Sequence, residues 1–358
     1  MAWHVLSSTY FDFERFDRES KADTLPHHLL PKIADRLGAE IHQPEQAMGS
    51  LLDRIGSVLY SEPEHWAQAR RVYPLLEDGD SVYTAGCDAG IPLALICAVR
   101  RRPVSFAIAF ADPTRLRPKL VGWLLVLLSL KLTVIVTTDH QERLVKRSFG
   151  RHVHSVRATE GQTDCKFFRP GDERRENDPP LVASCGVEQR DYRTMATALA
   201  DVDVEAKVCF VSPNRTTKTR YTLPDPVPAN FEFRHFEFLE LRELYQQADI
   251  VVVPLIENRY SAGLTTLFEA IACGTPIVVT ESPGIVQGLI EEGLILGVPP
   301  GDEVAMKAAV EGILADRPVA TRRAEAARAA IMERYSAGSY LDLLESILTG
   351  QPHPVTPI

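Results

Sequence analysis

Two short runs in the second half of the chain have the residue types of an anion-binding site. Gly186 precedes Arg190 by four residues, and a second glycine opens the run Gly263–Thr266, which ends in two threonines. A glycine lets a ligand approach the backbone, and a cation together with the unpaired N–H groups of a helix start favours a phosphate. The runs therefore predict a site for a phosphorylated ligand. Its expected binding residues are Gly186, Arg190, Gly263, Leu264, Thr265, Thr266 and Glu269.

Glu269 is the unusual member of this set, because it lies about one turn inside an otherwise apolar helical run, Leu267–Cys273. A carboxylate in such a place must be paired or bound to hydroxyl groups. Taken alone, it is equally explained as a first-turn glutamate stabilised by the helix dipole. Taken with Arg190 and the Gly263 run, it indicates a pocket for a nucleoside diphosphate. The cation and the amides would bind the diphosphate, and the carboxylate would accept from the ribose hydroxyls.

The hydrophobic pattern predicts the scaffold that positions these residues. Beyond residue 180, short apolar strands alternate with helices of about ten residues, which is typical of an open parallel sheet. Ligands of such sheets bind beyond the carboxyl ends of the strands, where both runs occur. The first half predicts a second parallel sheet, covered on both faces. Its expected strands are Trp3–Ser7, Ser81–Thr84, Val104–Phe110 and Val134–Thr137, with helices at His27–Leu37 and Leu93–Val99, the latter beginning at Pro92.

Charge and composition exclude several classes of protein. The 358 residues are 45% hydrophobic and carry a net charge of −9, so the chain as a whole is not expected to bind nucleic acid. The segment 100–157 differs, because its twelve basic and three acidic residues give +9. We expect this segment to be able to contact an anionic membrane surface. The sequence has no Walker-type loop, GxSxG elbow or HExxH motif, which argues against NTPases, hydrolases and zinc proteases.

The cysteines and the N-terminus favour a cytoplasmic protein. The six cysteines form no CxxC pair and no Cys/His cluster at metal-binding spacing, so we expect neither a zinc site nor a disulfide framework. The N-terminus has no basic start and apolar run of the kind that marks a signal peptide. The apolar stretch Leu120–Thr137 divides into a Leu-rich helix at Lys119–Leu130 and a β-branched strand at Thr133–Val136. This division favours a helix followed by a buried strand over a membrane-spanning helix.

A family resemblance rests on three runs: SAGLTTLFEAIACGTPIVVTESPGI, the preceding ADIVVVPL and the following GVPPGDEVAMKAAVEGIL. Together they closely resemble the C-terminal donor domain of GT-B glycosyltransferases, especially glycosyltransferase family 4. The likeness extends from about Leu181 to the C-terminus. A weaker likeness at Asp164–Pro170 is similar to the segment that closes the N-terminal domain in that family. The resemblance implies a metal-independent transferase with two Rossmann-like domains that face each other across a cleft.

The resemblance also implies roles for single residues. Glu269 matches the second Glu of the family's motif of two glutamates separated by seven residues, the one that binds the ribose. Arg190 matches a basic residue, usually Lys, that neutralises the diphosphate. Ser261 stands where the family has its first Glu, which binds the hydroxyls of the donor sugar. Glu257, four residues earlier, is the candidate replacement, and Arg190, Glu257 and Glu269 are the expected catalytic residues.

These observations predict a GT-B enzyme that transfers a hexosyl group from a nucleotide diphosphate sugar to a hydroxyl acceptor, with retention at the anomeric carbon. Neither a cofactor nor a metal is expected. Two alternatives remain open: a GT-B sugar-nucleotide epimerase, and a non-catalytic paralogue that binds a nucleotide or a partner. The expected domains are an acceptor domain at 1–172, a donor domain at 173–338 and a C-terminal helix with a tail at 339–358, which packs back on the first domain. Peripheral contact with the inner face of the membrane through residues 100–157 is also expected.

Overall fold

The computed structural model describes residues 1–45, 49–109, 123–124, 131–136, 142–143, 145–147, 154–157, 162–172, 176–210, 221–258 and 262–351. The chain divides into two compact units. The first unit contains Met1–Arg15, His28–Thr159 and Tyr340–Ile358, and the second contains Phe16–His27 and Glu160–Ser339. The chain therefore enters the second unit briefly near its beginning and returns to the first unit at its end. The sequence pattern gave no sign of the early excursion.

The first unit is built on a six-stranded sheet in the order β2-β1-β3-β4-β5-β6, in which every neighbouring pair is parallel. Helices cover both faces. The Val5 face packs on α2 and α14, while the Leu6 face packs on α4 and α5. The strands are β1 Trp3–Leu6, β2 Glu40–His42, β3 Ser81–Thr84, β4 Ser105–Ala109, β5 Lys131–Val136 and β6 His154–Arg157, and the helices are α2 Leu29–Leu37, α3 Leu51–Leu59, α4 Pro63–Val72, α5 Cys87–Val99 and α14 Ala337–Thr349. Helix α1 Phe13–Lys21 begins in this unit and continues in the second.

One helix of this unit begins earlier than the sequence indicated. Pro92 was expected to begin the helix, but α5 begins at Cys87 and contains Pro92 within it. Tertiary packing decides this start, because the residues from Ala89 to Ala94 are all buried under the sheet. Gly90 permits the close approach, since a Cβ there would lie 2.5 Å from Oγ1 of Thr84 on β3. The burial offsets the hydrogen bond that a proline removes from a helix.

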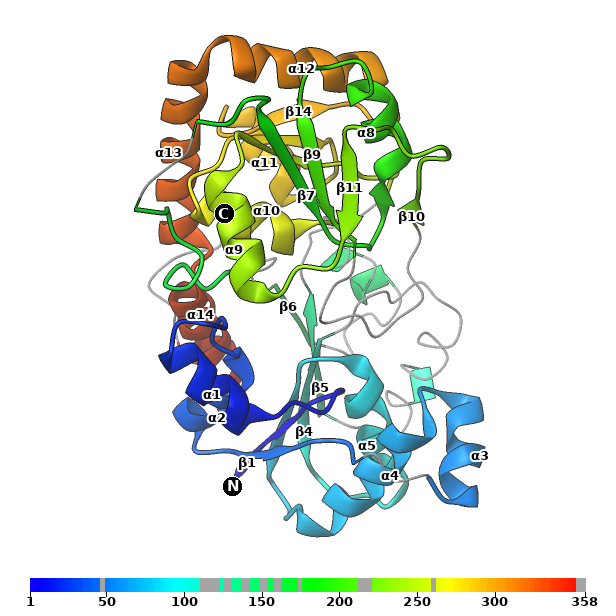
Figure 1. The fold of residues 1–358 in the computed structure, drawn as a ribbon. Coiled ribbons are helices and arrows are strands. Elements are labelled where there is room, and N and C mark those ends of the chain that lie inside the picture. Colours follow the sequence, from blue (N-terminus) through cyan, green and yellow to red (C-terminus); the bar gives the residue numbers. More distant parts are fainter. Residues whose placement is uncertain are drawn as a thin grey trace. The chain divides into compact units, whose positions relative to one another are not determined.

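The second unit has a six-stranded parallel sheet in the order β11-β9-β7-β12-β13-β14 (Figure 1). Numbered within the unit, this order is 3-2-1-4-5-6, the arrangement of dinucleotide-binding sheets. The β-branched strand β12 is buried along its whole length, as expected of a strand covered on both faces. The strands are β7 Leu181–Cys185, β9 Glu205–Cys209, β11 Phe231–Arg234, β12 Ile250–Val253, β13 Ile277–Thr280 and β14 Leu296–Val298, with the small pair β8 Arg190–Asp191 and β10 Tyr221–Thr222.

Helices cover both faces of this second sheet as well. One face packs on α9, α10, α11 and α13, and the other on α8 and α12. The strand order reverses between β7 and β12, so their carboxyl ends diverge and leave room for a ligand. The helices are α8 Tyr192–Leu199, α9 Phe238–Gln247, α10 Leu264–Ala272, α11 Ile285–Glu291, α12 Glu303–Ala315 and α13 Arg317–Arg334. The architecture confirms the predicted α/β fold with two parallel sheets.

Several predicted features lie outside the described residues. These are most of the Leu-rich helix Lys119–Leu130, most of the basic segment 100–157, and Ser261. Within the described part of the chain, no helix is both long enough and apolar enough to cross a membrane.

Candidate donor site

Arg190 lies at the centre of the loop that follows β7. Its guanidinium is buried and donates from Nε to the carbonyl of Cys185 at 2.8 Å, and from one terminal nitrogen to the carbonyl of Glu188 at 2.9 Å. The other terminal nitrogen donates to Oγ1 of Thr266 on α10 at 2.9 Å. One side chain therefore joins the end of β7 to the start of α10, across the point where the strand order reverses.

The two glycines predicted to bind the ligand enclose this guanidinium. A Cβ on Gly186 would lie 2.6 Å from a terminal nitrogen of Arg190, and a Cβ on Gly263 would lie 3.2 Å from the other. Both glycines also have positive φ, +101° and +79°, which side-chain-bearing residues rarely adopt. Gly263 is the residue that caps α10. The glycines are thus required by the position of the arginine as well as by their backbone conformation.

The start of α10 supplies donors beside the arginine. Thr266 is buried and donates to the carbonyl of Cys185 at 3.1 Å, whereas Thr265 is exposed and Leu264 is half-buried. The first N–H groups of a helix have no acceptor within the helix, and the helix dipole makes this end positive. The structure therefore brings Gly186, Arg190 and the run Gly263–Thr266 together at one edge of the sheet.

Glu269 lies one turn further along α10 and faces α9. Its side chain is buried, and the hydroxyl of Tyr245 donates to its Oε2 at 3.4 Å. Burial raises the pKa of this carboxyl well above its usual value, and the nearby Cys185 adds to the shift. In the absence of a ligand, burial therefore favours the protonated form of Glu269. Tyr245 was not foreseen from the sequence, because only the packing of α9 on α10 places it there.

Glu257 is not joined to these residues. It is exposed in the loop after β12, and no hydrogen bond or ion pair ties it to the described part of the chain. Ser261, the departure from the family motif, lies outside the described residues.

Ser282 is a polar residue at this edge that the sequence did not single out. It follows β13, is buried, and its Oγ has no hydrogen-bond partner among the described residues. A buried hydroxyl in the third loop of the same edge can serve a ligand that reaches across the strand ends. The sequence places the loop Glu281–Gly284 directly after a strand, but it does not show that the serine is buried.

Comparisons with known proteins agree with this geometry. The sequence profile of the family "Glycosyl transferases group 1" matches residues 182–316, which include every residue of the arginine cluster. The glycogen synthase of Mycobacterium tuberculosis is 34% identical over 94 residues, which are 26% of this chain and 22% of that protein. The chain thus matches about a fifth of the length of this curated relative.

Solved structures resemble the whole chain at low sequence identity. The sucrose-phosphate synthase of Thermosynechococcus elongatus has a TM-score of 0.70 at 15% identity, over 98% of this chain and 99% of that one. HepE of Anabaena, in complex with UDP and glucose, has a TM-score of 0.65 at 14% identity, over 98% and 100% of the two chains. The UDP-forming trehalose-phosphate synthase of Burkholderia vietnamiensis gives 0.65 at 14%, over 98% of each. At these identities the likeness shows the fold. The chain therefore has the GT-B fold, and its residues 182–316 match the family model of the group 1 glycosyl transferases.

Proposed function

We propose that this protein is a glycosyltransferase that takes a hexosyl group from a nucleotide diphosphate sugar bound at the carboxyl edge of the second sheet, and gives it to a hydroxyl acceptor. The observation that carries the proposal is the arginine cluster, in which a buried guanidinium lies between two glycines beside the start of α10. The matched family profile spans this cluster. Two structures of Anabaena HepE, described as complexes with UDP and with UDP-glucose, share the fold.

Arg190 is suited to stabilise the diphosphate as it leaves. A guanidinium has five N–H donors, and three of those in Arg190 bond to the described protein, so two remain for an anion. Because the side chain is already held in place, no free energy is needed to order it when charge develops on the departing group. The positive end of α10 adds to the same field.

Glu269 is suited to bind the ribose. The carboxylate form of Glu269 can accept a hydrogen bond from each of two ribose hydroxyls, and these bonds offset the desolvation that favours the protonated form in the free protein. Tyr245 keeps the carboxyl oriented. The nucleoside would then lie over α10, with its diphosphate toward Arg190.

The proposed reaction needs no base from the protein. The bond between the anomeric carbon and the diphosphate oxygen breaks, and a new bond forms between that carbon and the acceptor oxygen. The acceptor proton passes to the departing diphosphate on the same face of the sugar, which gives retention. Arg190 and the start of α10 take the place of the metal ion that balances the diphosphate charge in other enzymes.

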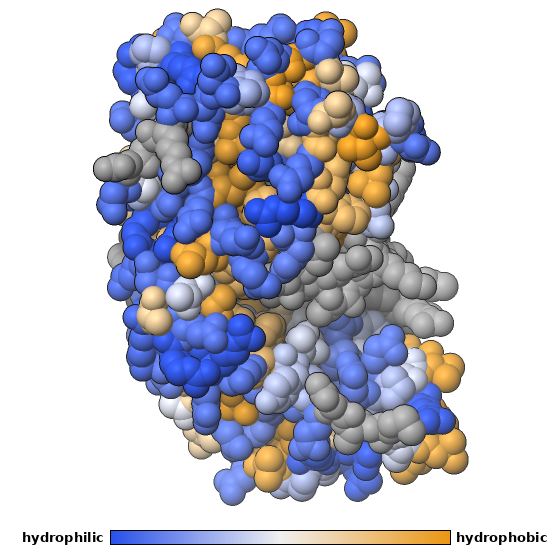
Figure 2. All heavy atoms as spheres, viewed as in Figure 1, coloured by the Kyte–Doolittle hydropathy of each residue, from blue (hydrophilic) through white to orange (hydrophobic). Residues whose placement is uncertain are grey.

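We also propose that the first unit contacts an anionic membrane, with α3 as the inserting element. Its five aliphatic residues lie on one face and are 47 to 76% exposed, which Figure 2 shows as a hydrophobic area where Figure 1 draws α3. The inward side is polar: Arg70 of α4 binds Asp53 at 2.6 Å through two nitrogens. The outward residues are Leu51, Leu52, Ile55, Val58 and Leu59.

A lipid surface fits this face better than a protein partner does. A stable protein interface takes about 20 to 30 residues a side, whereas α3 has nine residues in all. A short apolar helix face suffices to enter the boundary between headgroups and acyl chains. Arg54 is exposed on α3, where it complements anionic headgroups, whereas Arg70 and Arg71 at the end of α4 are already paired with Asp53 and Glu45. A membrane-proximal or lipid-linked acceptor follows from this placement.

The donor half of the proposal is tested by thermal shift with UDP, GDP and ADP, followed by release of free sugar from the matching nucleotide sugar without acceptor. A ligand that binds only the native state raises the melting temperature. We expect one of the three nucleotides to do so, and slow hydrolysis of its sugar conjugate. Formation of the epimeric nucleotide sugar would establish the epimerase alternative. Binding without any turnover would establish the non-catalytic one.

A further inference from the structure

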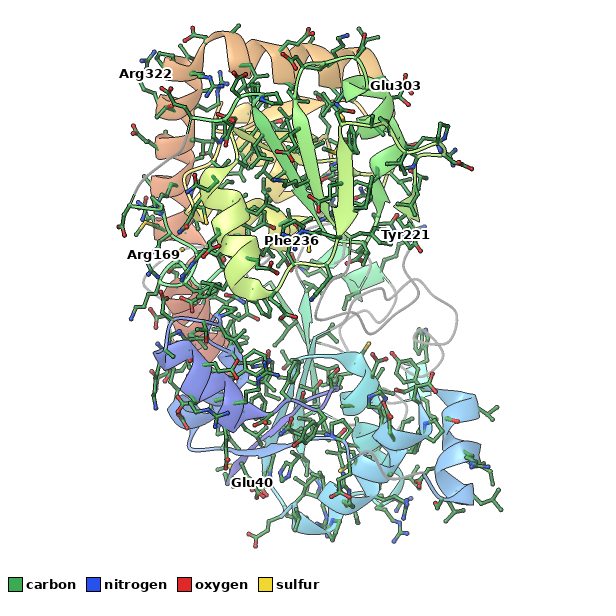
Figure 3. All side chains as sticks on the ribbon, in the orientation of Figure 1. Glu40, Arg169, Tyr221, Phe236, Glu303 and Arg322 are labelled. Carbon is green, nitrogen blue, oxygen red and sulfur yellow. The ribbon has the colours of Figure 1, made fainter. Side chains whose placement is uncertain are left out.

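Four ionisable side chains form a row across the first sheet, away from the donor site. His4 lies on β1, Glu40 and His42 lie on β2, and Asp80 immediately precedes β3. His4 pairs in register with Glu40, and His42 is two residues further along the same strand, so the three side chains project from the same face. Figure 3 labels Glu40 on this edge strand. His4 and Asp80 lie far in the sequence from the pair Glu40 and His42, which is why no metal-binding spacing was visible there.

The two imidazoles face one another. Nδ1 of His4 lies 3.0 Å from Nε2 of His42, and both rings are buried. Nδ1 of His42 lies 3.9 Å from Oε1 of Glu40. One ligand atom from each of these three residues falls within 4.8 Å of the others. The ligands of a tetrahedral zinc ion with bonds of 2.0 to 2.1 Å are about 3.3 Å apart. The two imidazole nitrogens, which share a hydrogen bond without an ion, are therefore close to chelating separation, whereas the exposed side chain of Glu40 has to rotate from the Nδ1 side of His42 toward its Nε2 to complete the site.

Asp80 supports the outer side of His4. Oδ2 of Asp80 lies 3.4 Å from Nε2 of His4, and the carboxylate accepts from the backbone N–H groups of Ala2 and Glu77, each at 2.7 Å. A carboxylate at Nε2 keeps the ring proton on that nitrogen and leaves the lone pair of Nδ1 directed at His42. Histidines that bind metals generally have such a carboxylate behind them.

A second buried polar group lies next to the backbone of His42. Gln68 of α4 is fully buried, and its Nε2 donates to the carbonyls of Ser7 and His42, each at 3.0 Å. Its Oε1 has no hydrogen-bond partner among the described residues. A buried amide oxygen without a donor costs free energy, which a nearby cation or a water bound to it removes.

We propose that His4, Glu40 and His42 bind a divalent transition-metal ion, with Asp80 orienting His4. Two neutral imidazoles and a carboxylate are a ligand set that zinc favours and that magnesium and calcium do not. The ion fastens the edge strand β2 to β1. His4 and Glu40 lie toward the amino ends of their strands, whereas ligands of open sheets bind at the carboxyl ends, so the ion stabilises the unit and takes no part in transfer.

The site is tested on the full chain after EDTA treatment and removal of the chelator. Titration calorimetry with zinc chloride should show one equivalent bound, and zinc should raise the melting temperature where magnesium does not. Cobalt(II), added in place of zinc, should develop the visible absorption of a low-symmetry nitrogen and oxygen site. Absence of zinc binding in the parent chain would refute the proposal.

Variants separate this site from adventitious binding of zinc to cysteine thiols. Glu40→Gln alters an exposed side chain and should weaken zinc binding at least tenfold without loss of folding. His42→Gln should abolish it, and Asp80→Asn should weaken it 10- to 100-fold. The matched control is His235→Gln, which removes an exposed histidine held 3.1 Å from Glu237 and should change nothing. If Glu40→Gln or a folded His42→Gln binds zinc like the parent, the site is elsewhere. Nucleotide-induced thermal shifts should be the same in the parent and in Glu40→Gln. A failure of the donor-site proposal is thereby distinguished from a failure of the metal-site proposal.

Discussion

Arg190 performs two tasks at once, and its variants should reveal both. Its three hydrogen bonds hold the β7 loop against α10, and its remaining donors face the proposed diphosphate. The surroundings explain why the basic residue here is arginine: a planar guanidinium fills the space between two glycines and bonds in several directions, which an ammonium group cannot do.

We expect Arg190→Ala to lower turnover about 100-fold or more, as loss of a preorganised transition-state donor does. Nucleotide affinity should fall less, because charge on the diphosphate grows as the glycosidic bond breaks. Steady-state kinetics and nucleotide titration measure the two effects. Arg193→Ala, an exposed arginine on α8, is the control. Equal losses in both measurements would assign Arg190 to ground-state binding alone.

Glu269→Gln should weaken nucleotide binding by about 1.5 to 3 kcal/mol, since hydrogen bonds to a carboxyl group are exchanged for weaker ones. The same change should stabilise the free protein above neutral pH. Burial raises the pKa of Glu269, so the folded state retains a proton that the unfolded chain releases, and stability falls as pH rises above the unfolded pKa of 4.5. The melting temperatures of the parent and of Glu269→Gln, measured from pH 5 to 9, should therefore converge at low pH. A variant with parent-like binding and the parent's pH dependence would place the ribose elsewhere.

Among the structural elements, the segment 16–27 is the least expected. It belongs to the second unit, where Asp23 binds Arg169 at 2.7 Å and Arg242 at 3.0 Å, and His27 binds Asp164 at 2.8 Å. Figure 3 labels Arg169 in this region. Two arginines around one carboxylate explain how so short a segment stays attached to a unit that is distant in sequence.

The hydrogen bond from Arg169 lowers the pKa of Asp23 to about 2. Because the folded pKa lies below the unfolded value of 3.8, the pair contributes stability above pH 4 and loses it as pH falls toward 2. Asp23→Asn should cost about 1 kcal/mol or less at pH 7, since both partners are partly exposed. Denaturant titrations at pH 7 and pH 2.5 measure the difference, which should be smaller at the lower pH. Asp17→Asn, in the exposed pair of Asp17 and Lys21, should have a smaller effect.

The face of α3 gives a prediction about binding to lipids. Ile55→Asp should reduce cosedimentation with phosphatidylglycerol vesicles at least tenfold, because a charge is placed in the inserting face. Val304→Asp alters a similarly exposed apolar residue on α12 in the second unit and serves as the control. Binding of the parent should fade as salt rises. Equal recovery of the parent in the supernatant with anionic and neutral vesicles would disprove the membrane contact.

For the whole molecule, transfer and metal binding are expected to be independent. Turnover well below the melting temperature should survive EDTA, because Arg190 and the start of α10 supply the positive charge at the donor site. The melting temperature itself should fall on chelation if the histidine cluster holds an ion. Activity that is lost with EDTA and restored by magnesium or manganese would instead assign a metal to the reaction.

The sequence determined much of the second unit. The strands Leu181–Cys185 and Ile277–Thr280 and the helix Tyr192–Leu199 were predicted with their observed bounds, because buried β-branched runs and short amphipathic helices are local signals. The gathering of Gly186, Arg190 and Gly263–Thr266 was also predictable, since parallel strands bring their carboxyl ends to one edge. Less followed from the sequence in the first unit, where β2 has three residues and α5 begins ahead of its proline.

Only the tertiary structure decided which distant residues meet. Tyr245 reaches Glu269 because α9 packs on α10, and the resulting burial raises the pKa of that carboxyl. His4 and His42 face each other because β1 and β2 pair in one register, which a shift of a single residue would undo. Local patterns in a sequence specify strands, helices and turns, since those depend on neighbouring residues. Burial and long-range pairing set the protonation of a carboxyl and the spacing of two imidazoles, and these exist only once the chain has folded.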